Sequence, residues 1–145
     1  MLDLILNKVI EGWRNDKARL FPPNNRAEVV SAFEKINRKC SADVIELYCA
    51  TGGMDEDSRD DKLFTLWSLN KIVLENTAFK GESVLDVAFG DYFIESHLYY
   101  FRYENENTSS VYTDGSKDGK IIKIADSVSE FFYIYLTDSK EIGLF

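Results

Sequence analysis

The first part of the chain places hydrophobic residues three or four positions apart, which is the spacing of amphipathic helices. Residues 2–15 are expected to form the first helix. A connection containing Pro22-Pro23 follows, because this pair favours extended backbone. Residues 25–28, Asn-Arg-Ala-Glu, have the form of a capping box, and an apolar stripe runs along residues 29–36 behind it. We therefore expect a second helix directly after this box.

A third helix and a short strand are expected in the middle of the chain. Ser41 stands at the position that would cap the third helix. Gly52-Gly53 are expected to end it, because a residue with positive φ commonly follows a helix C-terminus. The short apolar segment 63–67 then predicts a strand, and a short capped helix is expected over residues 68–74.

From residue 84 onward the chain changes to segments rich in aromatic and β-branched residues, separated by clusters of Asn, Asp and Gly. This pattern is typical of strands joined by turns. Hairpin turns are expected over residues 105–107 and 114–119. The predicted strands cover residues 84–89, 98–103, 109–113 and 120–125.

The last apolar run predicts a closing helix. Residues 127–130, Ser-Val-Ser-Glu, have the form of another capping box, and Asp138 is expected to end the helix. The side chains expected to be largely buried are Phe131, Phe132, Ile134, Tyr135 and Leu136. Helices, an antiparallel meander and a closing helix, in this order, predict an α+β fold in a single domain over residues 1–145.

The composition supports a packed core and favours a cationic partner. The 145 residues are 45% hydrophobic and 14% aromatic, which is enough apolar material for a domain of this length. Trp13 and Trp67 lie in apolar segments and are expected in the core. The 17 basic and 25 acidic residues give a net charge of −8. This charge disfavours binding to nucleic acid or anionic lipid and favours a cationic protein, although it also keeps a protein soluble.

Cysteine and histidine are too sparse for a zinc site. Cys40 and Cys49 are the only cysteines, and the chain has one histidine. Both thiols lie in helical patterns and are expected to be buried or half-buried. The N-terminus lacks a secretory signal, and the longest apolar run, residues 131–136, is too short to span a bilayer. We therefore expect a cytoplasmic protein without a membrane partner.

Several motifs follow one another in an order known from one family. Pro22-Pro23, a capped helix with Phe33-Glu34, the helix from Asp43 to Tyr48 and Gly52-Gly53 open the series, residues 89–97 continue it, and residues 124–132 close it. From about residue 20 to 137, this order resembles the SUKH superfamily of Smi/Knr-type domains. The proline that such domains carry near the third helix is absent here, where Ser41-Ala42 stand.

The resemblance implies a twisted, mainly antiparallel sheet of about five to six strands, flanked by N-terminal helices and a closing helix. It also implies a protein-binding role with no enzymatic activity and no cofactor. Many bacterial members are immunity proteins that neutralise a cognate toxin, often a nuclease. Fungal relatives regulate cell-wall assembly, so a regulatory interaction module is the alternative function.

The segment 55–61 is the leading candidate for partner contact, because it carries five acids and one base. Such a run can occupy the phosphate-binding groove of a cationic toxin, and it is equally typical of a solvated loop. The acidic turns over 104–107 and 114–118 are expected to extend the contact face. The expected contact residues are Asp55, Glu56, Asp57, Asp60, Asp61, Glu104, Glu106, Asp114 and Asp118. A second candidate surface is an outward row of Tyr on the strand from Leu98, unless both faces of that strand are packed.

Catalytic and metal sites are not expected. The segment 55–61 resembles a calcium loop but places Arg59 at a ligand position, and the loop from Asp114 lacks the closing carboxylate. His97, the one histidine, is interpreted as a structural or edge residue, since Ser96 would face the opposite side of a strand. Clustered carboxylates such as Asp91 and Glu95 leave an enzyme as the remaining rival.

Overall fold

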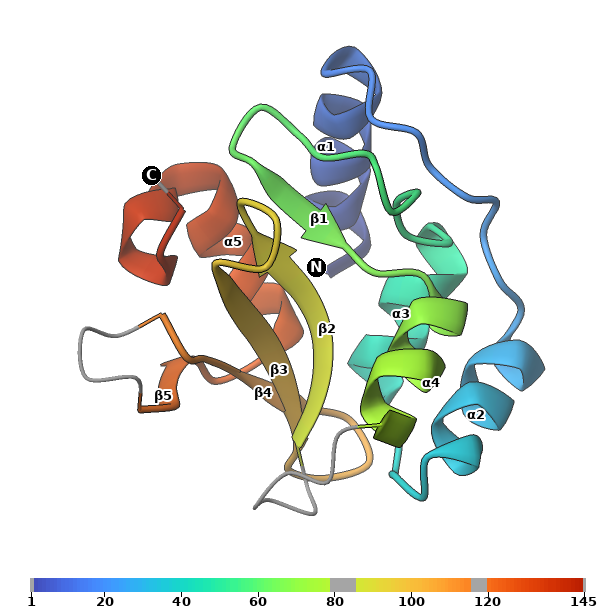
Figure 1. Cartoon of the computed structure of the whole chain (residues 1–145). Helices are drawn as coiled ribbons and strands as arrows, with labels where there is room; N and C mark the ends of the chain where they lie inside the picture. The colour runs from blue at the N-terminus through green and yellow to red at the C-terminus, as the bar shows by residue number, and fades with distance from the viewer. Residues whose placement is uncertain (1, 79–85, 116–119, 145) are drawn as a thin grey trace.

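The computed structural model describes residues 2–78, 86–115 and 120–144, and it has the expected α+β architecture (Figure 1). These residues form five α-helices, a closing 3-10 helix and one antiparallel sheet of five strands. Their order is α1 (Leu2–Asn15), α2 (Arg26–Lys35), α3 (Ala42–Ala50), β1 (Phe64–Leu66), α4 (Leu69–Ala78), β2 (Asp86–Tyr92), β3 (His97–Tyr103), β4 (Ser109–Thr113), β5 (Ile122–Ala125), α5 (Val128–Thr137) and η1 (Ser139–Ile142). None of the helices in these ranges has the length and apolar character needed to cross a membrane.

The sheet is a meander in which each strand pairs with its neighbour in the sequence, in the order β1-β2-β3-β4-β5. The register shifts by one residue between Ala88 and Gly90 of β2, which is a β-bulge at Phe89. Because β1 has only three residues, it pairs with the end of β2, and the beginning of β2 has a strand partner, β3, on one side only. Asn76 of α4 fills the other side: its side chain donates to Ala88 O and accepts from Ala88 N, both at 2.9 Å.

The helices pack in two groups around the sheet (Figure 1). α5 packs against β4 and β5 and also contacts α1 and α3, so these three helices share the core with the sheet. α2 packs on α3 and α4, and α4 lies beside β2. The first group, α1, α3 and α5, therefore covers one face of the sheet. The second group, α2 and α4, extends past the β1–β2 edge.

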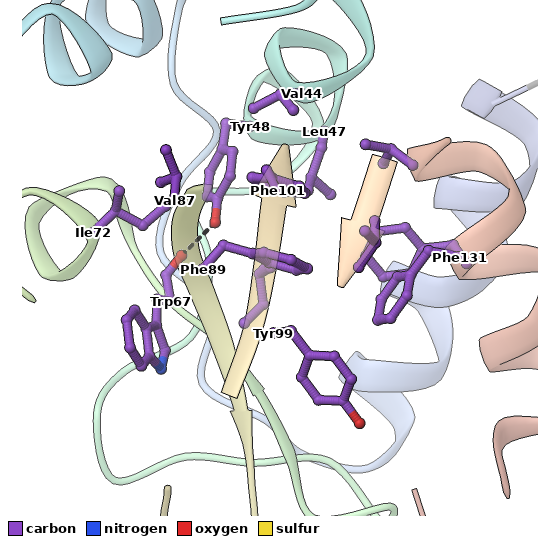
Figure 2. Close-up of a cluster of buried hydrophobic side chains, with 14 of the residues drawn as sticks. Val44, Leu47, Tyr48, Trp67, Ile72, Val87, Phe89, Tyr99, Phe101 and Phe131 are labelled. Atoms are coloured by element: carbon purple, nitrogen blue, oxygen red, sulfur yellow. Dashed lines mark hydrogen bonds between the residues drawn. The ribbon is translucent and has the colours of Figure 1, made fainter. Parts of the chain in front are cut away.

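Figure 2 shows the core where α3, α5 and the sheet meet. The rings of Phe89 and Phe101 are stacked on neighbouring strands, and Tyr48 of α3 donates its hydroxyl to Trp67 O at 2.7 Å. Trp13 and Trp67 are each 1% exposed, so their expected place in the core is confirmed. A buried Tyr or Trp needs a partner for its polar atom, and both tryptophans find a carboxylate, as described below.

The N-terminus of α2 is confirmed, whereas the cap of α3 differs from the expectation. Asn25 and Glu28 form both bonds of the capping box. Ser41 occupies the N-cap of α3 but makes no capping bond, because its hydroxyl lies 2.5 Å from Asp43 Oδ1 and 2.6 Å from Ser109 Oγ. Ser41 therefore connects Asp43 of α3 with Ser109 of β4 through hydrogen bonds.

The role expected for Gly52-Gly53 is also different. The C-cap of α3 is Thr51, which has extended backbone. Gly53, with φ of 88°, comes two residues later, and a Cβ on Gly52 would lie 2.2 Å from the carbonyl oxygen of Pro22. The glycines therefore let this segment pair closely with Phe21, whose N–H donates to Gly53 O at 2.8 Å.

The closing helix α5 keeps half of its expected capping box. Ser127 Oγ accepts from Glu130 N at 3.0 Å, but the Glu130 carboxylate accepts from Asp126 N instead of Ser127 N. The helix ends at Asp138, as expected. Leu136 is exposed, contrary to the expectation, because it falls on the outer face of α5, whereas the preceding Tyr135 is buried.

The two cysteines differ in exposure. Both thiols are free. Cys40 is half-buried, and burial raises the pKa of its thiol to about 12. Cys49 is exposed on α3, so the expectation that both thiols are at least half-buried is wrong for this residue.

Candidate functional site

The acidic segment 55–61 forms a loop between α3 and β1, at the end of the sheet where β2 turns into β3 (Figure 1). Glu56 and Asp57 are exposed, as expected. Asp55 is half-buried: its Oδ2 lies 4.0 Å from Nε of Arg19, and its Oδ1 accepts from Asp57 N at 3.3 Å. The first three residues of the loop thus present two accessible carboxylates and a third that lies near an arginine.

Asp60 is the exception within this loop, because it is only 3% exposed. Its Oδ2 accepts from the indole N–H of Trp13 at 3.0 Å and from the hydroxyl of Tyr135. Its Oδ1 accepts from the backbone N–H groups of Lys62 and Phe64 at 2.8 and 3.0 Å. Burial raises the pKa of Asp60 above its ordinary value, although these hydrogen bonds act in the opposite direction. The expected exposure of Asp60 is therefore wrong, and this side chain holds the loop to α1 and α5.

Asp61 is exposed and lies beside a second carboxylate that the sequence pattern does not reveal. Its backbone N–H donates to Asp16 Oδ2 at 3.2 Å. The neighbouring carboxylate of Asp16 raises the pKa of Asp61 above its ordinary value. Neighbouring carboxylates repel each other when both are charged, so a cationic group from a partner would relieve the repulsion. Asp16 lies 45 positions away, which is why no local motif pairs the two residues.

The turn between β2 and β3 lies next to this loop. Phe93 N donates to Leu63 O at 2.9 Å, so the turn contacts the residues that directly follow Asp61. Phe93 is 52% exposed and Ile94 is 68% exposed. These two residues lie between the predicted strands 84–89 and 98–103, and no local pattern in the sequence marks them as a contact surface.

A hollow lies on the other side of the acidic loop. Asp55 and Glu56 line a cavity of about 330 Å³ together with Phe21, Lys71 and Leu74. A larger cavity of about 470 Å³ adjoins it between α2 and α4 and shares Phe21 with it. The loop therefore has an apolar hollow at one margin and the exposed β2–β3 turn at the other.

The turn over 104–107 lies at the opposite end of the sheet. The seven residues of β3 separate it from the β2–β3 turn, a span of roughly 20 Å. Glu104 accepts from Ser110 Oγ at 2.7 Å, and Glu106 O accepts from Ala42 N at 2.7 Å. Both side chains are exposed, as expected. The structure therefore does not bring Glu104 and Glu106 together with segment 55–61.

Asp114 is half-buried and Asp118 lies outside the described residues. Asp114 accepts from Leu98 N at 2.7 Å and from the hydroxyl of Tyr100 at 2.9 Å. Tyr100 is only 5% exposed. Tyr99 and Tyr100 are both buried, on the two faces of β3, so both faces of this strand are packed and these tyrosines do not form the candidate outward row.

His97 is held between two aromatic residues. Its ring stacks on Tyr92 with 4.9 Å between centroids, and its Nε2 lies 3.1 Å from the hydroxyl oxygen of Tyr99. Burial lowers the pKa of His97 below its ordinary value. The neighbouring Ser96 donates its hydroxyl to Phe93 O at 2.8 Å. The imidazole and this hydroxyl are therefore engaged separately, and they do not form a nucleophile–base pair.

Asp91 and Glu95 do not form a pair of accessible carboxylates. Asp91 is buried, and its Oδ2 accepts from the indole N–H of Trp67 at 2.7 Å. Its Oδ1 accepts from the backbone N–H of Glu95 at 3.3 Å. Within residues 2–78, 86–115 and 120–144, no three His, Cys, Asp or Glu side chains are grouped as metal ligands. The loop that begins at Asp114 falls partly outside these ranges.

Comparisons with protein-family models, curated proteins and solved structures find no match to this chain.

Proposed function

We propose that this chain is a non-catalytic protein-binding domain that acts as an immunity protein. In this proposal it neutralises a cognate bacterial toxin in the cytoplasm by occluding the toxin's working surface, and a nuclease is the first toxin class to test. The observation that carries the proposal is the concentration of accessible carboxylates at one end of the sheet, where Glu56, Asp57 and Asp61 are exposed. Asp16 and Asp55 add two partly accessible carboxylates to this group, which we call the acidic end.

Electrostatics favours a cationic partner for the acidic end. A toxin that cleaves nucleic acid must hold phosphate in a positively charged groove. Carboxylates placed at that groove compete with phosphate for the same basic side chains, and opposite fields accelerate the encounter of the two proteins. The net charge of −8 acts in the same direction.

The hydrogen bonds made by three candidate catalytic side chains support a binding role. The side chains that could do chemistry here are Asp60, Asp91 and His97, and each has partners inside the fold. Asp60 and Asp91 are also buried. The exposed carboxylates, in contrast, are spread over a loop and are suited to contacts with another surface.

The similarity of the motif order to SUKH-type domains supports the immunity role independently of charge. Pro22-Pro23 and the capping box at Asn25 both lie in the region that the resemblance covers. A fold alone does not fix a function, so the toxin-neutralising activity requires its own test.

A protection assay tests this function. The domain encoded directly upstream of this chain's gene, which is the toxin under this proposal, is expressed in bacteria with the chain, without it, or with a Glu56→Lys/Asp61→Lys variant. We expect growth with the wild-type chain, growth arrest without it and weakened protection by the variant. Binding without protection would contradict immunity and favour a regulatory interaction module. Absence of binding would contradict the whole proposal.

A further inference from the structure

The turn between β2 and β3 has an unusual backbone. Phe93, Ile94 and Glu95 follow one another with φ values of 49°, 53° and 62°. None of them is glycine, and positive φ is unfavourable for residues with a Cβ, above all for a β-branched residue such as isoleucine. Glycine or asparagine would form such a turn with less strain.

The turn is fixed in place by several hydrogen bonds. Phe93 N donates to Leu63 O at 2.9 Å, and Ser96 N donates to Tyr92 O at 2.9 Å. The Ser96 hydroxyl and the Glu95 N–H add bonds to Phe93 O and to the buried Asp91 carboxylate. Asp91 is itself bonded to an indole of the core. A side chain on this turn therefore starts from a defined position and loses little freedom when it binds.

The two apolar side chains on the turn contribute little to the core. Ile94 is 68% exposed and Phe93 is 52% exposed. Single exposed apolar residues are common on protein surfaces, but here two adjacent ones occupy positions where the backbone disfavours them. Because neither burial nor turn chemistry accounts for Phe93 and Ile94, their exposure on this strained turn points to contact with another molecule.

The charges around the turn indicate the chemistry of that molecule. Asp61 and Asp16 lie beside the residues that contact the turn, and Glu95 is exposed on the turn itself. Lys62 points inward, with its ammonium 2.8 Å from Tyr135 O. Lys17 is exposed next to Asp16 and only partly offsets these acids. An apolar centre with a charged margin is the arrangement of an interface hot spot.

We propose that Phe93 and Ile94 are the apolar anchor of the acidic end, and that they insert into an apolar pocket bordered by Lys or Arg side chains on a cationic partner protein. This inference rests on the proposed function and adds to it the residues that supply the binding free energy. The acids would then speed and orient the encounter, and the anchor would slow dissociation.

Substitution by asparagine separates recognition from folding. Asparagine tolerates positive φ better than isoleucine or phenylalanine does, so Ile94→Asn and Phe93→Asn should leave the melting temperature unchanged or raise it. The control is Leu4→Asn, which removes an apolar side chain that is 63% exposed near the beginning of α1. Residue 4 lies roughly 18 Å along the helix from Asp16.

Binding is measured by calorimetry with the purified domain that is encoded directly upstream of this chain's gene and is the toxin under the proposed function. We expect each turn variant to weaken binding roughly tenfold or more, with the dissociation rate rising more than the association rate falls, and Leu4→Asn to bind like the wild type. Wild-type affinity in both turn variants would overturn the anchor and leave the proposed function intact. A wild-type chain that does not bind this domain would overturn both.

Discussion

Asp60 illustrates how packing gives one carboxylate of an acidic run a structural role. Four donors, from Trp13, Lys62, Phe64 and Tyr135, converge on its two oxygens. Asp60→Ala would leave these donors without their acceptor, so we expect the free energy of unfolding to fall by about 2–4 kcal/mol. Urea denaturation measures this change. Asp57→Ala, three positions earlier on the exposed part of the loop, should change stability by less than about 0.5 kcal/mol, and equal losses in the two variants would contradict the assignment.

The raised pKa of Asp60 also predicts a pH dependence. The native state binds this proton more tightly than the unfolded chain, whose aspartates have the ordinary pKa of 3.8. Between 3.8 and the raised value, the contribution of Asp60 to stability therefore falls as the pH rises. The wild type should gain stability relative to Asp60→Asn as the pH is lowered into this window. If the wild type instead lost stability relative to Asp60→Asn on acidification, the pKa shift would have the opposite sign.

His97 can be titrated directly, because it is the one histidine of the chain. Burial between Tyr92 and Tyr99 lowers its pKa below 6.5. Protonation therefore favours the unfolded state, and the contribution of His97 to stability is lost as the pH falls below 6.5. We expect the imidazole NMR signals to titrate below 6.5 in the folded protein and near 6.5 in urea. A folded-state pKa above the unfolded value would contradict the described environment.

At the scale of secondary-structure elements, Asn76 takes the place of a missing strand partner. Its amide pairs with both backbone groups of Ala88 on β2. Asn76→Ala would leave a donor and an acceptor without partners, so we expect a loss of about 1–3 kcal/mol in the free energy of unfolding. Asn70→Ala, at an exposed position on the same helix, is the control and should be nearly neutral. Helix propensity alone favours alanine over asparagine, so an equal loss of stability in both variants would contradict the assignment of the effect to the bridge with β2.

The elements themselves were largely predictable from the sequence, because their signals are local. The spacing of apolar residues gave α1 its bounds, the capping box at Asn25 located α2, and strands β3 and β4 followed from their aromatic and β-branched residues. The length of α4 was underestimated, since the short helix expected to reach Leu74 continues to Ala78. Its last turn contains Asn76, which a neighbouring strand holds in place.

The candidate site was less predictable, because its geometry depends on contacts between distant segments. Local charge predicted that Asp60 is exposed like the other acids of the segment. Its hydrogen bonds to Trp13 and Tyr135, which lie 47 and 75 positions away, bury it instead. The proximity of Asp16 to Asp61 arises in the same way. Phe93 and Ile94 lie between the predicted strands 84–89 and 98–103, and their exposure was not predictable because the left-handed turn that carries them is fixed by tertiary hydrogen bonds.

At the scale of the whole molecule, two groups of exposed acids lie at opposite ends of β3, and other exposed acids lie on the helices. Glu56, Asp57 and Asp61 lie with the exposed β2–β3 turn, whereas Glu104 and Glu106 lie on the β3–β4 turn. If net charge alone attracted the partner, both groups would contribute equally. If the acidic end is the recognition surface, only the first group makes close contacts.

The most direct test of this claim compares two charge reversals of equal size. Glu56→Lys/Asp61→Lys changes the acidic end, and Glu104→Lys/Glu106→Lys changes the far turn. Each variant is titrated by calorimetry with the domain encoded directly upstream of this chain's gene, the proposed partner, at roughly 50 mM salt, where surface charges are weakly screened. We predict that the first variant loses roughly 100-fold or more in affinity, whereas the second loses less than roughly tenfold. Equal affinities of the two variants would contradict the assignment of the acidic end as the recognition surface.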